Sequence, residues 1–404
     1  MSWRWQPPVL SPVSPRSLLA GLAAACGFTR PDEESLITTL RERYDASEVL
    51  LTDSGTSALV LALRALAPFG GTVAYPGYAC IDLTAAAVRA GVKIRLYDLD
   101  PGTLSPDLDS LRDVIARGVD AIVVAHLYGY PSDIRAVHNL AAVHGIPVIE
   151  DSAQGAGGML RGARLGSLAD ISILSFGRGK GTTAGAGGAV LVRTPALAEW
   201  ARNTRGTLGP ATRGGRQIVG LAAQWLLAHP VLYRLPVSIP GLKLGEMVYH
   251  PASQPRAIAA AAAAILPAAL ALDDQELACR RAHALDLLSR MNGLARIDPI
   301  RSVTGGESGY LRLAFVDRTG DVAPRPSLGA LRGYPLTLEQ HEQLTPHLLA
   351  GERAGKGSVF LRDRLFTVPT HSRVGREDLA RLADWLSPRT RTAKLPLSVA
   401  LEHR

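Results

Sequence analysis

The chain has 404 residues, of which 47% are hydrophobic and 20% are charged. This composition is ordinary for a globular protein, and the length allows two domains, or one large domain with a small one. The three cysteines, Cys26, Cys80 and Cys279, are too far apart in sequence for a metal-binding motif or a disulfide framework, which favours a cytoplasmic protein. The net charge of +8 comes from scattered arginines, so nucleic acid is not expected as a partner.

The sequence shows no secretory signal and no membrane-spanning segment. Residues 1–8 are interrupted by proline, and the longest apolar run, 218–228, is about half the length that spans a bilayer. Together with residues 231–235, this run could lie on a membrane or cover a partner subunit. A buried connecting helix is the preferred interpretation, so membrane contact is not expected.

After an N-terminal helical arm over residues 1–45, short apolar segments alternate with helical ones. Strands alternating with helices predict right-handed βαβ units around a mainly parallel sheet, and thus an α/β fold. The expected strands are 48–52, 72–75, 93–97, 121–125, 146–149, 170–175 and 189–192, and the expected helices between them are 56–67, 83–90, 107–116 and 134–144. Ligands of such sheets collect beyond the carboxyl ends of the strands.

The large domain is predicted to comprise residues 46–250. Within it, residues 205–250 contain many glycines and prolines and are expected to form a crossover or interface region. Residues 251–404 are predicted to form a smaller α+β domain that ends in a polar tail. Its expected elements are helices 257–272, 276–291 and 377–386, and strands 310–315 and 365–368.

Lys180 lies in a glycine-rich turn between two predicted strands. Glycine lets a ligand approach the backbone closely, and a lysine in a partly desolvated pocket can lose its proton and form an imine with a carbonyl cofactor. Alternatively, Lys180 is a solvated residue of a flexible hairpin. Ser175 ends the preceding strand, from which a hydroxyl could reach the phosphate of the same ligand.

Two further motifs follow predicted strands. Ser54, Gly55 and Thr56 begin a helix, where backbone N–H groups and hydroxyls either bind an anion or simply cap the helix. Asp151 ends a strand, where a buried carboxylate needs a cationic partner such as a pyridinium nitrogen, unless it only caps a helix. Gln154 could donate to a ring oxygen. Together these motifs describe a pocket for pyridoxal 5'-phosphate.

On these motifs the chain resembles the DegT/StrS-type sugar aminotransferases, a branch of the fold-type I pyridoxal phosphate enzymes. The similarity runs from about residue 45 to 388. The matching segments are SGT at 54–56, YDLD at 97–100, HLYG at 126–129, IEDSAQ at 149–154 and SFGRGK at 175–180. The resemblance implies a seven-stranded, mainly parallel sheet between helices, and a homodimer whose active sites are completed by the partner subunit.

The resemblance also assigns roles to individual residues. Lys180 would form the imine with the cofactor, and Asp151 would pair with the pyridine nitrogen. Gln154 would bind the ring hydroxyl. The phosphate would be held by residues at the start of the first large-domain helix and at the end of a strand: Ser54, Gly55, Thr56 and Ser175.

Several positions depart from the family pattern. Cys80 stands where the family has an aromatic residue that stacks on the cofactor, and Tyr78 either supplies that ring or is a packed core residue. Gln254 replaces an asparagine that reaches the phosphate of the other subunit. Arg178 either binds a substrate anion or is solvated. His126 is expected to be a core residue satisfied by the backbone rather than a site residue.

The function that follows is a pyridoxal phosphate-dependent aminotransferase. It would move an amino group from glutamate or glutamine to a keto sugar, nucleotide-linked by expectation, in polysaccharide or natural-product biosynthesis. One alternative is a non-transaminating enzyme with the same cofactor, such as a lyase or aldolase. Another is a non-catalytic regulatory or binding protein on the same fold. Retention of Lys180 argues against the family's dehydratases, in which histidine replaces it.

Overall fold

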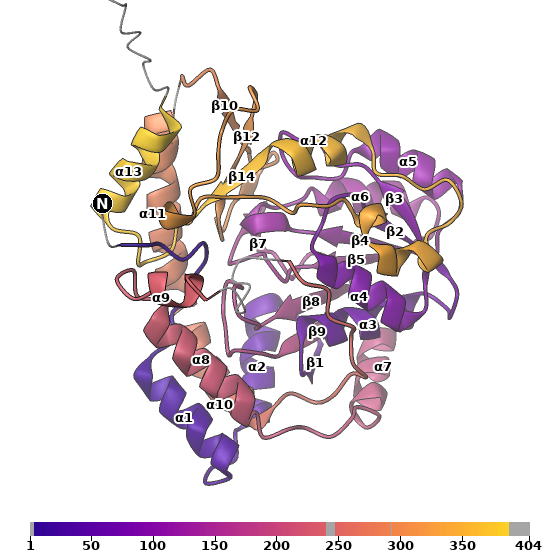
Figure 1. Ribbon diagram of the computed structural model, residues 1–404. Coiled ribbons are helices and arrows are strands. Elements are labelled where there is room, and N and C mark those ends of the chain that lie inside the picture. Colours follow the sequence, from indigo (N-terminus) through magenta and orange to yellow (C-terminus); the bar gives the residue numbers. More distant parts are fainter. Residues whose placement is uncertain (1–3, 240–246, 292, 388–404) are drawn as a thin grey trace, which may run out of the picture.

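The computed structural model describes residues 4–239, 247–291 and 293–387. The predicted polar tail, from residue 388, lies outside this part of the chain. A large sheet flanked by helices forms one half of the structure, and a smaller sheet with two long helices forms the other (Figure 1). None of the helices in the described ranges is long and apolar enough to cross a bilayer.

The large sheet has seven strands, as the resemblance implies. Its order is β1-β9-β8-β5-β4-β2-β3. Strands β8, β5, β4, β2 and β3 are parallel, whereas β9 runs antiparallel to both β1 and β8. The mainly parallel sheet is thus confirmed. The strands are β1 (Glu48–Thr52), β2 (Thr72–Pro76), β3 (Lys93–Tyr97), β4 (Ala121–Ala125), β5 (Val148–Asp151), β8 (Ile171–Ser175) and β9 (Gly188–Val192).

The crossover helices begin and end at residues with clear local signals. Asp107 and Asp133 cap the starts of α5 and α6, because their carboxylates accept hydrogen bonds from backbone N–H groups in the first turn. Gly91 ends α4 in the left-handed conformation, with φ of 76°. These elements are α3 (Gly55–Leu66), α4 (Ile81–Ala90), α5 (Leu108–Ala116) and α6 (Ile134–Ala142).

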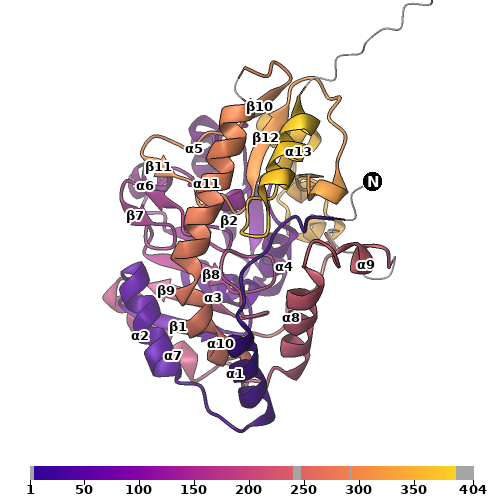
Figure 2. The same cartoon turned by 90° about the vertical axis from the view of Figure 1, so that its left-hand side faces the viewer.

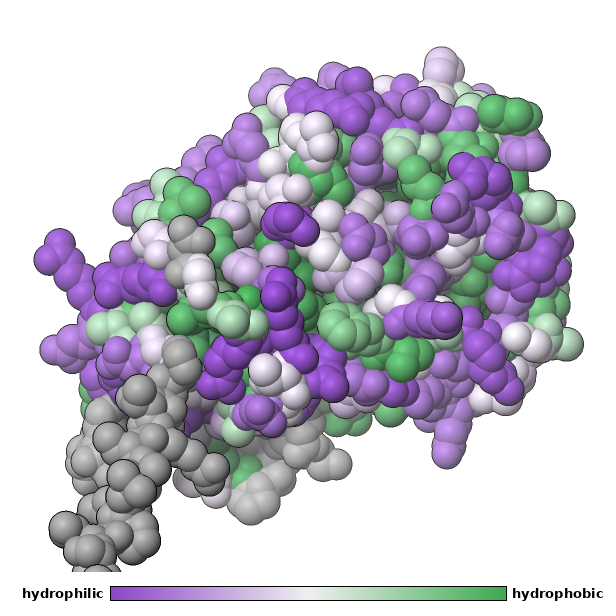
Figure 3. Space-filling model, turned by 90° about the horizontal axis from the view of Figure 1, so that it is seen from above, coloured by the Kyte–Doolittle hydropathy of each residue, from purple (hydrophilic) through white to green (hydrophobic). Residues whose placement is uncertain are grey.

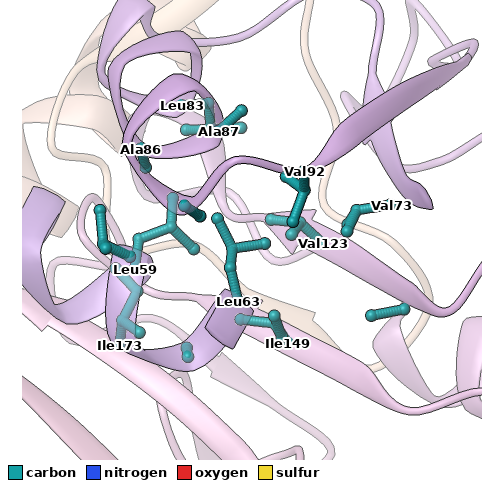
Figure 4. Packing of buried hydrophobic residues seen from close by; sticks show 14 of the residues in the cluster. Leu59, Leu63, Val73, Leu83, Ala86, Ala87, Val92, Val123, Ile149 and Ile173 are labelled. Carbon is teal, nitrogen blue, oxygen red and sulfur yellow. The ribbon is translucent and has the colours of Figure 1, made fainter. Parts of the chain in front are cut away.

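Apolar residues on both faces of the sheet explain its continuous hydrophobic strands. On one face, Leu59 and Leu63 of α3 pack over Ile149 and Ile173 (Figure 4). On the other face, Val49 and its neighbours pack against α1 (Pro15–Cys26), α2 (Glu33–Tyr44) and α10 (Ala260–Ala271). Helix α10, expected in the C-terminal domain, therefore packs with the large sheet. The division of the chain into domains stays a prediction.

The smaller half contains a four-stranded antiparallel sheet in the order β10-β12-β14-β13, as an α+β domain predicts. Helices α11 (Asp273–Met291) and α13 (Arg376–Leu386) pack together beside it (Figure 2). Its strands are β10 (Ile297–Pro299), β12 (Leu313–Asp317), β13 (Leu331–Arg332) and β14 (Leu365–Val368). Helix α12 (Lys356–Arg364) was not predicted.

A short three-stranded sheet connects the two halves. Strand β11 (Gly306–Glu307) pairs with β6 (Met159–Leu160), which pairs with β7 (Ala163–Arg164). The remaining helices, α7 (Pro195–Arg205), α8 (Gly215–Leu227) and α9 (Arg234–Val237), leave the end of β9. Seen from above, the surface is mostly hydrophilic, with apolar side chains scattered between polar ones (Figure 3).

Gly188 provides a test of the packing that brings α3 to the sheet. A Cβ atom there would lie 2.5 Å from the carbonyl carbon and oxygen of Ser54, which are backbone atoms. We expect Gly188→Ala to lower the free energy of unfolding by about 2 kcal/mol in a denaturant titration, through overpacking. Gly215→Ala is the control, because nothing lies within 4 Å of its added Cβ. Equal stability of the two variants would contradict this account.

Candidate active site

Seven of the predicted site residues line one pocket beyond the carboxyl ends of the parallel strands. They are Gly55, Thr56, Cys80, Asp151, Gln154, Ser175 and Lys180. Three predicted residues, Ser54, Tyr78 and Gln254, do not line it. The carboxyl ends of the strands therefore bring together residues that are separated by up to 125 positions in the chain.

The first turn of α3 forms one end of the pocket. Ser54 caps this helix, since its hydroxyl oxygen accepts a hydrogen bond from the N–H of Ser57 at 3.1 Å. A Cβ on Gly55 would lie 2.5 Å from the Cβ of Ser175. Glycine at this position thus lets the Ser175 hydroxyl lie against the helix terminus. Positive helix-dipole charge and hydroxyls at one place favour an anion.

Asp151 lies deeper in the pocket, at the end of β5, and is only 6% exposed. Its Oδ1 accepts a hydrogen bond from the N–H of Ala153 at 2.9 Å. Burial raises the pKa of Asp151 above its ordinary value, although this hydrogen bond and the charge of Lys180 oppose the shift. A buried carboxylate with so few donors fits a cationic ligand group.

Lys180 lies in the turn between β8 and β9 and is half-buried at the pocket. Burial lowers the pKa of its amine, but Cys80, Asp82 and Asp151 together outweigh burial, so the pKa lies above its ordinary value. Desolvation was expected to lower the pKa of this amine until it lost its proton, but in the protein chain alone the pKa is raised instead. The acidic neighbours hold the amine in its charged form.

Residues far away in the chain fix the lysine turn from behind. The hydroxyl of Ser11 donates to the carbonyl of Lys180. The guanidinium of Arg280 donates to the carbonyls of Gly181, at 3.0 Å, and Leu10, at 3.3 Å. A Cβ on Gly181 would lie 2.7 Å from the Cα of Ala156. The turn is thus a packed structure and not a flexible hairpin.

His126 and Glu150 form a buried network under the pocket. His126 accepts a hydrogen bond from the N–H of Ser132 through Nδ1, at 3.0 Å, so Nε2 carries the proton shared with Glu150, also at 3.0 Å. Glu150 also accepts from two backbone N–H groups, those of Gly166 and Leu168. Burial raises the pKa of Glu150, but His126 and these backbone donors outweigh burial, so the pKa lies below its ordinary value. His126 is buried as a core residue would be, but its Nε2 partner is a carboxylate and not the backbone, and the residue also lines the pocket.

Gln154 is held by the protein at both ends of its amide. Its Oε1 accepts from the N–H of Tyr128 at 3.0 Å, and its Nε2 donates to the hydroxyl of Tyr334 at 2.6 Å. Tyr334 stacks on Tyr128 with ring centroids 5.3 Å apart. Tyr78 lies beneath them, fully buried, and its hydroxyl accepts from the N–H of Tyr334. This placement fits the packed-core alternative for Tyr78.

Two other residues singled out in the sequence lie at the surface. Gln254 is exposed, and its side-chain oxygen accepts a hydrogen bond from Arg89 at the end of α4. Arg178 is also exposed, beside Gly220 of α8. Neither lines the pocket of its own chain. A role for Gln254 toward a partner subunit stays a prediction.

Sequence reasoning missed Asp82, which lines the pocket in the first turn of α4. The charge of Asp82 raises the pKa of Lys180. Burial raises the pKa of Cys80 to about 12, and the charge of Asp82 adds to this rise. Asp82 lies six residues beyond the end of β2, in α4, so a search for polar residues directly at strand ends does not single it out. Cys80 at this pKa is a neutral thiol at physiological pH.

Residues 28–220 match the DegT/DnrJ/EryC1/StrS aminotransferase family, which confirms the resemblance stated above. Two curated relatives are similar to parts of this chain. An L-glutamine:2-deoxy-scyllo-inosose aminotransferase of Streptomyces fradiae is 29% identical over 290 residues, which cover 70% of this chain and 60% of that protein. A UDP-N-acetyl-3-dehydro-alpha-D-glucosamine 3-aminotransferase of Acidithiobacillus ferrooxidans is 37% identical over 155 residues, covering 38% of this chain and 41% of that one.

Solved structures show the same fold. The sugar aminotransferase CalS13 of Micromonospora echinospora superposes with a TM-score of 0.73 at 22% identity, covering 94% of this chain and 98% of that one. The E. coli GDP-4-keto-6-deoxy-D-mannose-3-dehydratase with bound hydrated PLP has the same TM-score at 15% identity, covering 95% and 100%. These likenesses confirm fold type I. The sequence matches span less than two-thirds of the curated relatives named above.

The raised pKa of Asp151 predicts a stability effect in the cofactor-free protein. The folded state binds a proton at Asp151 more readily than the unfolded chain, so the ionised carboxylate destabilises folding, and this cost disappears as the pH falls through the folded pKa. We expect Asp151→Asn to unfold at a higher temperature than wild type at pH 7. The difference should shrink in thermal melts at decreasing pH. The exposed Asp113→Asn is the control, and an equal gain there would contradict the interpretation.

Proposed function

We propose that this protein is a pyridoxal phosphate-dependent aminotransferase that converts a keto sugar to an amino sugar. One observation carries the proposal. A single pocket holds an amine, Lys180, and a buried carboxylate, Asp151, and at its other end the start of α3. An amine, an acid and an anion site in this order match an aldehyde, a ring nitrogen and a phosphate of one small molecule.

The residues present fit this cofactor. Thr56 and Ser175 would hold its phosphate at the start of α3, where Gly55 leaves room for the Ser175 side chain. Asp151 would hold the ring nitrogen. Its carboxylate accepts a hydrogen bond from the N–H of Ala153, but burial still raises its pKa, so a cationic group beside it would be favourable. When bound, the cofactor supplies an electron sink for carbanion chemistry.

Lys180 is the group in the pocket that is placed to move protons. Its Nζ would take a proton from the substrate carbon and return it to the cofactor carbon, which requires a neutral amine. Asp151 and Asp82 favour the charged amine in the chain alone. A cation held against Asp151 would compete for that carboxylate and so favour the neutral amine. The donors behind the turn keep the backbone of Lys180 in place.

The relatives indicate the class of substrate. The Streptomyces protein is named for glutamine and 2-deoxy-scyllo-inosose, and the Acidithiobacillus protein for a UDP-linked keto sugar. Both acceptors are cyclic polyhydroxy ketones. We therefore propose glutamine or glutamate as the donor and a ketone of this kind, nucleotide-linked by preference, as the acceptor in a biosynthetic pathway.

We further propose a cytoplasmic homodimer whose two sites are shared. The thiols of Cys26, Cys80 and Cys279 are all free, which suits a reducing compartment. Gln254 is exposed in a single chain although it occupies the position from which the family reaches the partner's phosphate. An exposed polar residue at such a position fits a contact that only the second subunit completes.

Replacing Lys180 tests the proposed chemistry. We expect Lys180→Ala to lose the imine absorbance after cofactor addition and to lower turnover by roughly a thousandfold or more, because the proton-transfer group is gone. Lys356→Ala is the control, since Lys356 is exposed at the start of α12. Wild type mixed with glutamine or glutamate alone should convert from the imine band to the amine band. A lyase or aldolase would leave the imine band in place.

Mixed dimers test the role of Gln254. We expect Lys180→Ala and Gln254→Ala each to be impaired alone, and their refolded equimolar mixture to recover about a quarter of the wild-type activity, because half the dimers contain one complete site. Activity is measured with the donor and a ketone acceptor. No recovery, with heterodimers verified by mass spectrometry, would place Gln254 outside the partner's site.

A further inference from the structure

Exposed apolar side chains gather in two segments of the structure. Of the sixteen large hydrophobic residues exposed in the described ranges, ten lie within residues 4–31 and 206–250. They are Leu19, Leu22, Phe28, Val219, Trp225, Leu226, Val231, Leu235, Ile239 and Val248. Exposed apolar side chains that gather in this way mark a candidate interaction site.

The two segments lie side by side. Helices α1 and α8 pack against each other, and both pack against α10 (Figures 1 and 2). Arg213, just before α8, lies next to Gly27 at the end of α1. The outward sides of α1 and α8, with the chain around α9, therefore form one surface, which we call the α1–α8 face.

Helix α8 is apolar on both sides, which differs from the expected buried connecting helix. Ile218 and Leu221 are buried against the helices beneath, but Val219 is 68% exposed and Leu226 is 54% exposed. Arg216, Val219 and Leu226 fall on one side of the helix by its 3.6-residue period. Arg16, Leu19 and Leu22 repeat this arrangement on α1. Each stripe thus begins with an arginine and continues with aliphatic residues.

The charge of the α1–α8 face has one sign. The described residues 4–31 and 206–239 contain no aspartate or glutamate, but they contain six arginines. Arg16, Arg213 and Arg216 are exposed, and none of them forms an ion pair with a described residue. All of the acidic residues of the chain lie outside these two segments, so their positive charge attracts anions.

We propose that the α1–α8 face lies on the surface of an anionic phospholipid bilayer. Helices that carry arginine beside exposed aliphatic residues bind at the lipid interface, where the side chains enter the headgroup region and the arginines meet the lipid phosphates. The helices do not span the bilayer, so attachment is peripheral. This location goes beyond the proposed function and does not depend on it.

Other occupants fit the face less well. A two-fold dimer through this surface would place the acid-free segments of both copies together, and like charges at an interface are unfavourable. Nucleic acid would match the charge, but single-stranded binding uses aromatic platforms. Eight of the ten exposed large hydrophobic residues here are aliphatic, and only Phe28 and Trp225 are aromatic. An anionic bilayer satisfies both the charge and the aliphatic surface.

Vesicle sedimentation with the full-length protein tests the proposal. We expect wild type to sediment with vesicles of phosphatidylglycerol and phosphatidylcholine, and not with phosphatidylcholine alone. The double variant Val219→Glu, Leu226→Glu should lower the partition coefficient at least tenfold. Arg213→Gln and Arg216→Gln should each lower it roughly fivefold. Salt should weaken wild-type binding more than that of the arginine variants.

Val143→Glu is the matched control, because Val143 is 81% exposed and lies directly after α6, away from the α1–α8 face. Its partition should equal that of wild type, and circular dichroism should show every variant folded. Failure of wild type to sediment with anionic vesicles would overturn the proposal. An equal loss of partition in the control would also overturn it. Light scattering tests the competing occupant: if wild type binds no vesicles and the double variant changes from dimer to monomer, the face is a subunit interface.

Discussion

The close approach of backbone segments at two glycines determines where the candidate site forms. Gly55 leaves room for Ser175, and Gly188 leaves room for the carbonyl of Ser54. The start of α3 therefore meets the end of β8 and the start of β9 at one point. Because the turn that carries Lys180 joins those two strands, the same contact places its amine at the edge of the sheet where Asp151 ends β5. Side chains at either glycine would separate these elements.

Much of this arrangement could be predicted from the sequence, because it depends on local patterns. Apolar runs of the right length predicted all seven strands of the large sheet, and polar residues at strand ends predicted Lys180, Asp151 and Ser175 at one pocket. Asp82 was not predicted because it lies in the first turn of α4, six residues beyond the end of β2, and not directly at a strand end. Helix α12 was missed because its charged sequence buries little beyond Ser358 and Leu361.

The rest depends on contacts between residues distant in the chain, for which no local pattern exists. Nothing near Tyr78 in sequence indicates that its hydroxyl accepts from the N–H of Tyr334. The alanine-rich α10 has no clear apolar face, so its sequence could not show which sheet it covers. The exposed side of α8 is another case. Its apolar residues are equally compatible with burial, and only their placement shows that one side faces outward.

The hydrogen bonds that hold the lysine turn determine how much of the chain is needed to keep the candidate site in shape. Ser11 and Arg280 donate to the carbonyls of Lys180 and Gly181, yet both lie outside residues 28–220, the part that matches the family. A fragment limited to those residues would retain Lys180 and Asp151 while losing the donors that hold the turn. Residues 28–220 are therefore not structurally self-sufficient, since residues before and after this part of the chain complete the geometry of the lysine turn.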